Sequence, residues 1–154
     1  MVSRMTKVSI AIIISDYYKK ISEGLITGAK DYCNENNLSH KTFNVVGALE
    51  IAGAIKIISD KSSGNSFDGY VALGCVIRGE TSHYDYVCSE SARALMDLSI
   101  DGFAIGYGIL TVENYEQAMV RSKTVANKGL GKGKVAALAC INQINLKTKY
   151  TNGT

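Results

Sequence analysis

The hydrophobic positions of this chain form short apolar runs that alternate with stretches of helical spacing. Residues 8–15 are a continuous run rich in β-branched side chains, which is typical of a strand that is covered on both faces. Residues 70–77 and 103–110 are predicted as further strands, and 38–46 as a weaker one because it carries polar positions. We therefore expect four strands.

Apolar residues with helical spacing follow each predicted strand. The five segments are 21–33, 49–60, 87–96, 111–126 and 132–146. The expected apolar face of the third helix consists of Val87, Cys88, Ala92, Leu95 and Met96. Thr111 is the expected N-cap of the fourth helix, with Glu113 in the first turn, where the helix dipole favours an acidic residue.

The order of these elements is four strands that alternate with helices, followed by one extra helix. This order predicts an α/β fold with a parallel sheet, helices on both faces and right-handed crossovers. The length of 154 residues indicates one domain over 1–154. Within it we expect an N-terminal arm at 1–7 and a loose polar tail at 148–154.

The stretch 74–87 combines the end of a buried strand, a polar turn and the start of a helix. The amides of Gly79, Glu80 and Thr81 would point out of the helix start, where anions bind well. His83 would lie in the first turn, and histidine is suited to moving protons near neutral pH. Taken alone, His83 reads more simply as a solvated histidine. Its place beside an anion cradle favours a site for a phosphorylated substrate that undergoes proton transfers.

Three other residues are predicted at the same sheet edge, because the carboxyl ends of parallel strands meet there. Tyr17 and Tyr107 could stack on a flat heterocycle or simply pack at the rim. Glu50 could accept hydrogen bonds from ligand hydroxyls, or be an ordinary carboxylate of a first helical turn.

Arg121 is a candidate phosphate clamp, provided that its helix end faces the His83 turn of a neighbouring chain. Without that arrangement it would be a surface arginine. Lys128 has the same two interpretations with weaker support.

Charge and cysteine spacing exclude several classes of function. The net charge of +3 and the absence of a Lys/Arg-rich run argue against a nucleic-acid partner. Four cysteines without a C-x-x-C pair, and only two histidines, give no zinc spacing, so we expect free thiols in a reducing compartment. No apolar run approaches the ~20 residues of a membrane span, and we expect a cytoplasmic protein without a signal peptide.

Two glycine motifs do not fit a nucleotide site. Residues 129–134 (GLGKGK) lack the spacing and the hydroxyl residue of a phosphate loop. Residues 106–108 (GYG) lack the third glycine of a dinucleotide fingerprint and lie within a predicted strand. NAD binding is therefore rejected.

Assembled in order, these residues resemble the 6,7-dimethyl-8-ribityllumazine synthase family, which catalyses the penultimate step of riboflavin synthesis. The resemblance covers nearly the whole chain. Its blocks are 47–51 (GALEI), 74–87 (GCVIRGETSHYDYV), 107–111 (YGILT), 113–118 (ENYEQA), Arg121 and 127–129 (NKG). The pattern V-I-R-G-x-T-x-H-Y-D-Y-V is highly specific.

The resemblance implies a flavodoxin-like α/β/α sandwich with a four-stranded parallel sheet. It implies condensation of 5-amino-6-(D-ribitylamino)uracil with 3,4-dihydroxy-2-butanone 4-phosphate, which yields the lumazine, phosphate and water. No metal or organic cofactor is implied. The expected partner is the chain itself, in a homo-pentamer at least and possibly a decamer or 60-mer, with active sites between subunits.

Site residues follow from the same resemblance. His83 matches the proton donor. Residues matched to the pyrimidine and ribityl contacts are Tyr17, Ala48, Leu49, Glu50, Cys75, Val76, Ile77 and Tyr107. Residues matched to the phosphate are Glu80, Thr81, Arg121 and Lys128. Tyr107, Arg121 and Lys128 would come from the adjacent subunit.

The chain departs from the family at four positions. Val46 and Ala52 stand where proline is usual, so the turn at Gly47 must hold its shape without a fixed φ. Tyr18 stands where asparagine is common, and Tyr17 replaces phenylalanine.

Two alternatives accompany the resemblance. One is a riboflavin synthase of the related archaeal-type lineage, against which the His83 block argues. The other is a non-catalytic shell protein that binds flavin or lumazine, against which the intact His83 and Arg121 argue.

Overall fold

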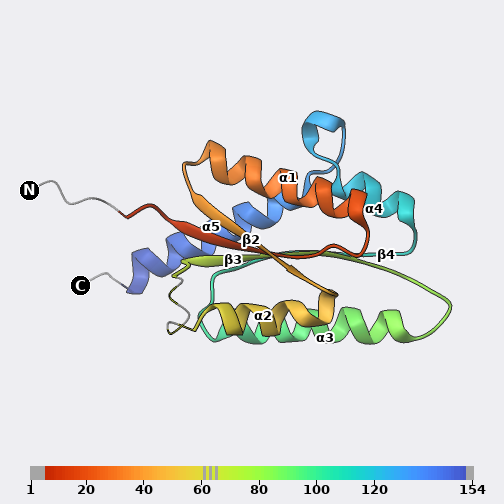
Figure 1. Ribbon diagram of the computed structural model, residues 1–154, viewed down its shortest axis with the longest axis horizontal. Helices are drawn as coiled ribbons and strands as arrows, with labels where there is room; N and C mark the ends of the chain where they lie inside the picture. The colour runs from red at the N-terminus through yellow and green to blue at the C-terminus, as the bar shows by residue number, and fades with distance from the viewer. Residues whose placement is uncertain (1–5, 61, 63, 65, 152–154) are drawn as a thin grey trace, which may run out of the picture.

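The computed structural model describes residues 6–60, 62, 64 and 66–151, and its centre is a four-stranded parallel sheet (Figure 1). The strands are β1 (Ser9–Ser15), β2 (Ser39–Val45), β3 (Gly69–Ile77) and β4 (Ile105–Val112), in the order β2-β1-β3-β4. This confirms the predicted α/β class and agrees with a flavodoxin-like three-layer fold, in which a crevice forms where the strand order reverses. β1 and β3 lie at that reversal.

Helices cover both faces of the sheet, as Figure 1 shows. On one face lie α1 (Lys19–Glu35), α4 (Tyr115–Ser122) and α5 (Lys132–Thr151). On the other lie α2 (Ile51–Ile58), which follows the short turn η1 (Ala48–Glu50), and α3 (His83–Ile100). Alternate side chains of β1 pack into the two resulting cores, with Ile12 and Ile14 on the α1 side and Ile13 on the α2 side.

Two glycines allow α5 to lie unusually close to its neighbours. A Cβ atom at Gly106 would stand 1.9 Å from the carbonyl oxygen of Ala136, and one at Gly133 would stand 2.0 Å from that of Leu25. Both distances are far below van der Waals contact, so α5 is pressed against β4 and α1 at these points.

The connection after β4 differs from the expectation. Thr111 is a strand residue, paired in register with Val76, and does not cap a helix. The N-cap is Asn114, whose side chain accepts a hydrogen bond from the Gln117 amide at 2.9 Å. The sheet pairing extends β4 to Val112 and displaces the helix start, and α4 already ends at Ser122.

Two further predictions are corrected at the ends of helices and on the face of α3. α5 continues to Thr151, so residues 148–151 are helical and are not a loose tail; residues 152–154 and 1–5 lie outside the described residues. Ala92 and Met96 are exposed, because Val87, Ser91 and Leu95 form the face that α3 buries. No helix in the described part of the chain is long and apolar enough to cross a membrane.

Candidate active site

A cavity of about 490 Å³ opens at the carboxyl ends of β1 and β3, where η1 and the start of α3 also meet. It brings together eight of the thirteen residues predicted for the site. They are Tyr17, Ala48, Leu49, Glu50, Cys75, Val76, Ile77 and His83. We call this space the His83 cavity.

Aromatic rings stand at the entrance to the His83 cavity. The Tyr17 side chain is 77% exposed, so a face of its ring is free for stacking. The Tyr18 ring meets it edge-on, with centroids 4.9 Å apart, and lies 6.5 Å from the ring of Tyr115. Burial raises the pKa of Tyr18 above the ordinary value for tyrosine. Tyr18 extends the aromatic wall of the cavity, whereas Tyr115 contacts Tyr18 from outside the lining.

The turn after β2 supplies one polar wall. Gly47 is extended (φ −149°), and its carbonyl accepts a hydrogen bond from the Glu50 amide at 3.2 Å. The Glu50 carboxylate also folds back toward Gly47, where an added Cβ would stand 3.0 Å from Oε2. These contacts hold the turn without the proline that the family usually carries nearby, and Glu50 lies exposed at the cavity.

The last part of β3 forms the floor. β1 pairs with β3 only as far as Leu73, whereas β4 pairs with it up to Ile77. Residues 75–77 therefore present one edge of their backbone to the cavity, where amide and carbonyl groups can bind a flat heterocycle. Gly74 leaves room for the Ser15 hydroxyl at this end of β1, because a Cβ there would stand 2.4 Å from Ser15 Oγ.

The Cys75 thiol in this floor is an unreactive group at neutral pH. Burial, and secondarily the nearby Cys88, raises its pKa to about 12. Because the thiolate is the nucleophilic form of cysteine, Cys75 is suited to packing against a ligand and not to covalent catalysis.

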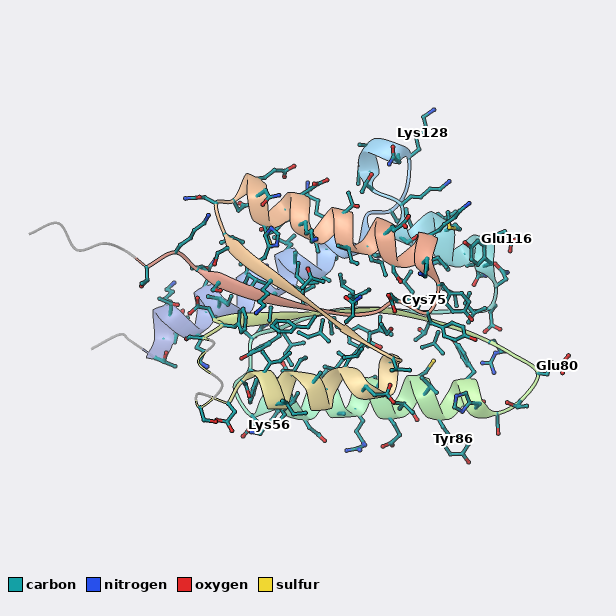
Figure 2. All side chains as sticks on the ribbon, in the orientation of Figure 1. Lys56, Cys75, Glu80, Tyr86, Glu116 and Lys128 are labelled. Atoms are coloured by element: carbon teal, nitrogen blue, oxygen red, sulfur yellow. The ribbon has the colours of Figure 1, made fainter. Side chains whose placement is uncertain are left out.

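His83 is the first residue of α3 and lies exposed in the cavity. Its amide donates to Thr81 Oγ1 at 3.3 Å. Glu80 and Thr81 are exposed in the preceding turn, and Figure 2 shows the Glu80 side chain directed away from the sheet. The backbone amide of Glu80, and not its carboxylate, is therefore the group that suits an anion.

Arg121 and Tyr107 lie in a different cavity, of about 270 Å³, which runs along β4 at the edge of the sheet. We call it the β4-edge cavity. Arg121 Nη1 donates to the Gln117 carbonyl at 3.0 Å, and Lys132 adds a second cation. No described residue lines both cavities, so one chain does not bring Arg121 to His83.

Lys128 lies in neither cavity. It follows the turn η3 (Val125–Asn127) in the left-handed region (φ 61°) and is exposed. Figure 2 shows it at the tip of the connection between α4 and α5, pointing away from the rest of the chain.

Arg78 is a residue at this edge that the sequence reading did not single out. Its guanidinium contacts Glu113 and Asp85 beside the His83 turn. The signal available in the sequence was an arginine just before the helix start and an acidic residue in the first helical turn. Among the described residues there is no group of three or more His, Cys, Asp and Glu side chains that could hold a metal ion.

Comparisons with known proteins agree with this geometry. The model of the family described as 6,7-dimethyl-8-ribityllumazine synthase matches residues 7–148. A protein of that name from Sphingopyxis alaskensis is 47% identical over 133 residues, which cover 86% of this chain and 92% of the relative. Another from Bartonella tribocorum is 46% identical over 145 residues, covering 94% and 93%. A third from Agrobacterium fabrum is 44% identical over 148 residues, covering 94% and 98%.

A match of this extent, in a chain that has the expected parallel sheet and gathers the predicted residues at its carboxyl edge, identifies the family. The chain belongs to the 6,7-dimethyl-8-ribityllumazine synthase family.

Proposed function

We propose that this chain condenses 5-amino-6-(D-ribitylamino)uracil with 3,4-dihydroxy-2-butanone 4-phosphate to give 6,7-dimethyl-8-ribityllumazine, phosphate and water. The observation that carries the proposal is the His83 cavity. It gathers an exposed aromatic ring, a carboxylate, a free strand edge and a histidine from separate parts of the chain. These groups suit a flat heterocycle with a hydroxylated side chain.

The pyrimidine lies, in this proposal, between Tyr17 and the free edge of β3. The exposed Tyr17 ring offers a stacking face, and the backbone of residues 75–77 offers hydrogen bonds to the ring edge. The ribityl chain extends toward Ala48, Leu49 and Glu50, where the carboxylate accepts hydrogen bonds from its hydroxyl groups.

The phosphate of the four-carbon substrate occupies the turn before α3, where the amides of Glu80 and Thr81 precede the helix start. His83 then moves protons as the uracil amine attacks the ketone and a Schiff base forms. A proton leaves the carbon next to the imine, and the phosphate departs from the neighbouring carbon with its bonding electron pair, which gives an enol that becomes a ketone. The ribitylamino nitrogen attacks this ketone, and loss of a second water closes the lumazine ring. Preorganised amides and a cation stabilise the charge that develops on the leaving phosphate.

The cation and a second aromatic ring come from an adjacent subunit. Arg121 and Tyr107 line a cavity at the open edge of the sheet, where a neighbouring chain can approach. Lys128 is the third residue assigned to this contribution, from the projecting loop before α5. A free monomer is therefore expected to be inactive.

Exposed apolar side chains support such an assembly. Met96 and Ile100 on α3, Tyr107 on β4, and Val135 and Leu138 on α5 are 43–79% exposed. Apolar groups exposed together at the edge of a sheet are typical of a protein interface. We propose a homo-pentamer at least, in which a decamer or 60-mer would be built from the same unit, and a cytoplasmic location that suits the four free cysteines.

The first experiment mixes the purified protein with both substrates and follows lumazine absorbance and phosphate release together. Appearance of the two products in equal amounts supports the proposal. Tight binding of the pyrimidine or of a flavin without turnover would indicate a binding shell instead. Conversion of the lumazine to riboflavin would indicate the dismutating riboflavin synthase.

A further inference from the structure

We propose that Arg78 is a positioning residue, which holds the turn before His83 in the arrangement that the substrate phosphate requires. The inference rests on the proposed function, because it assumes that this turn receives the phosphate. Arg78 would act through the turn and would not itself touch the substrate.

The guanidinium of Arg78 joins separate elements at the carboxyl edge of the sheet. Its Nε donates to Glu113 Oε2 at 2.9 Å, and its Nη1 donates to Asp85 Oδ1 at 3.3 Å. Its Cζ lies 4.2 Å from the centroid of the Tyr84 ring. A side chain at the end of β3 therefore reaches both the first turn of α3 and the connection between β4 and α4.

The Glu113 end of this link is firmly held. The Glu113 amide donates to Gln117 Oε1 at 2.9 Å, and the Gln117 amide donates to the cap residue Asn114 at 2.9 Å. The Arg78 amide also donates to the Val112 carbonyl at 3.0 Å, next to Glu113. Arg78 thus ties the turn to a corner that is itself fixed by hydrogen bonds.

The turn, by contrast, has little packing of its own. Gly79, Glu80, Thr81 and Ser82 are exposed, and a Cβ added at Gly79 would meet no atom within 4 Å. Ser82 precedes the helix without a side-chain capping bond. Hydrogen bonds within the turn join His83 to Thr81 at 3.3 Å and Asp85 to Ser82 at 3.0 Å.

The ion pairs of Arg78 are exposed to solvent, which favours a positioning role for this residue over a stabilising one. The three side chains are 40–62% exposed, and exposed pairs contribute little to the stability of a fold. A planar guanidinium with two acceptors nevertheless fixes direction as well as distance. Because small displacements of binding groups lower the rate of a two-substrate reaction, the contribution of Arg78 should appear in kinetics.

Helix α3 contains a matched control for Arg78. Arg93 also contacts two carboxylates, Glu90 at 2.8 Å and Asp97 at 2.9 Å, but all three residues belong to α3 and lie away from the turn. Arg93→Met removes the same charge and the same number of ion pairs as Arg78→Met. The difference between the two variants therefore isolates the effect on the turn.

The experiment measures the KM of each substrate, kcat and the thermal midpoint for Arg78→Met, Arg78→Lys, Glu113→Gln and Arg93→Met. We expect Arg78→Met to raise the KM for the butanone phosphate by about tenfold, with the pyrimidine KM within about twofold of wild type. Its thermal midpoint should match that of Arg93→Met, which should keep wild-type kinetics. Arg78→Lys should restore part of the loss, and Glu113→Gln should raise the same KM.

Three results would overturn the proposal. If Arg78→Met leaves the KM for the butanone phosphate unchanged, Arg78 has no positioning role. The same conclusion holds if the KM values of both substrates rise equally. If Arg78→Met raises that KM while Glu113→Gln leaves it unchanged or lowers it, Arg78 contacts the phosphate directly and is not a positioning residue. Should Arg78→Met fail to fold, the KM ratio of the two substrates in Arg78→Lys and Glu113→Gln decides in the same way.

The wild-type assay distinguishes this proposal from the proposed function. Wild-type protein that forms no lumazine removes both proposals. Wild-type turnover with a normal ratio of substrate KM values in Arg78→Met removes only the role of Arg78.

Discussion

The two cavities that contain most of the predicted site residues differ in how completely one chain encloses them. The His83 cavity takes its walls from β1, η1, β3 and α3 of one chain, and it has a floor, a polar wall and an aromatic entrance. The β4-edge cavity is about 270 Å³, compared with about 490 Å³, and its walls come from the edge strand β4 and the flanking helices α4 and α5. One is a pocket within the chain, and the other lies on the open edge of the sheet, where we propose that a neighbouring subunit completes it.

The two cavities also differ in the charged side chains that line them. The His83 cavity carries Glu50 and a histidine, whereas the β4-edge cavity carries Arg121 and Lys132. A substrate with a phosphate at one end and a ketone at the other would be served by both together. Under the proposed function, the phosphate site is completed only by a neighbouring subunit, whereas most of the groups proposed for the pyrimidine lie in one chain.

The largest expected effect is the loss of the histidine. His83→Ala should lower kcat by ~10²-fold or more, the usual scale for a group that transfers protons. Pyrimidine binding, measured by equilibrium titration, should remain. The control is His40→Ala, because His40 lies on β2, where its ring contacts Asn34 at 3.1 Å. A loss of less than about fivefold in His83→Ala would remove this residue from the mechanism.

Loss of the arginine should affect one substrate selectively. Arg121→Ala should raise the KM for the butanone phosphate by about tenfold or more, and that for the pyrimidine far less, because only the phosphate loses a charge-assisted hydrogen bond. Lys123→Ala, which removes an exposed cation just after α4, is the matched control. Equal effects on the two substrates would refute the phosphate assignment.

Mixing the two variants tests whether the cavities combine between subunits. His83→Ala and Arg121→Ala chains, denatured and reassembled together, should regain roughly a quarter of wild-type activity if neighbours complete each site at random. A mixture no more active than its separate components would place both residues in the same chain's site, against the comparison.

The packing of the first cavity can be tested through Gly74. Gly74→Ala should lower the free energy of unfolding by about 1 kcal/mol and weaken pyrimidine binding, because the added methyl group would displace the buried Ser15 hydroxyl. Gly79→Ala, which meets no atom within 4 Å, should change stability by less than about 0.5 kcal/mol. Urea unfolding of both variants gives the measurement, and similar midpoints would contradict the close packing at Gly74.

The smallest expected effect concerns the two thiols that burial keeps protonated. Burial raises the pKa of Cys75, in the His83 cavity, and of Cys140, behind β4, to about 12, above the ordinary value of 9.0. Their contribution to stability is therefore fully present below about pH 9 and is lost as the pH rises toward 12. In urea unfolding experiments, the free energy of unfolding should decrease less between pH 7.5 and pH 10 for Cys75→Ala than for wild type. An identical decrease would indicate that Cys75 ionises normally.

Local pattern predicted much of the site. The continuous run at β1 and the strand, turn and helix at 74–87 were readable because strand and helix periodicity depends on near neighbours. The same approach failed at Thr111, because threonine and asparagine are both common N-cap residues and the local sequence offered each of them. Pairing with β3 extends β4 past Thr111, and that contact is not visible in the local sequence.

The sequence by itself determined the order of the elements, the parallel sheet, the place of His83 at a helix start and the family. The tertiary structure decided which of the predicted residues meet. It put Arg121 and Tyr107 in one cavity along β4, left Lys128 outside both cavities and linked Arg78 to Glu113 across 35 positions of the chain. The physical reason is that periodicity is set by residues within one or two turns, whereas edges, cavities and ion pairs depend on how distant segments pack.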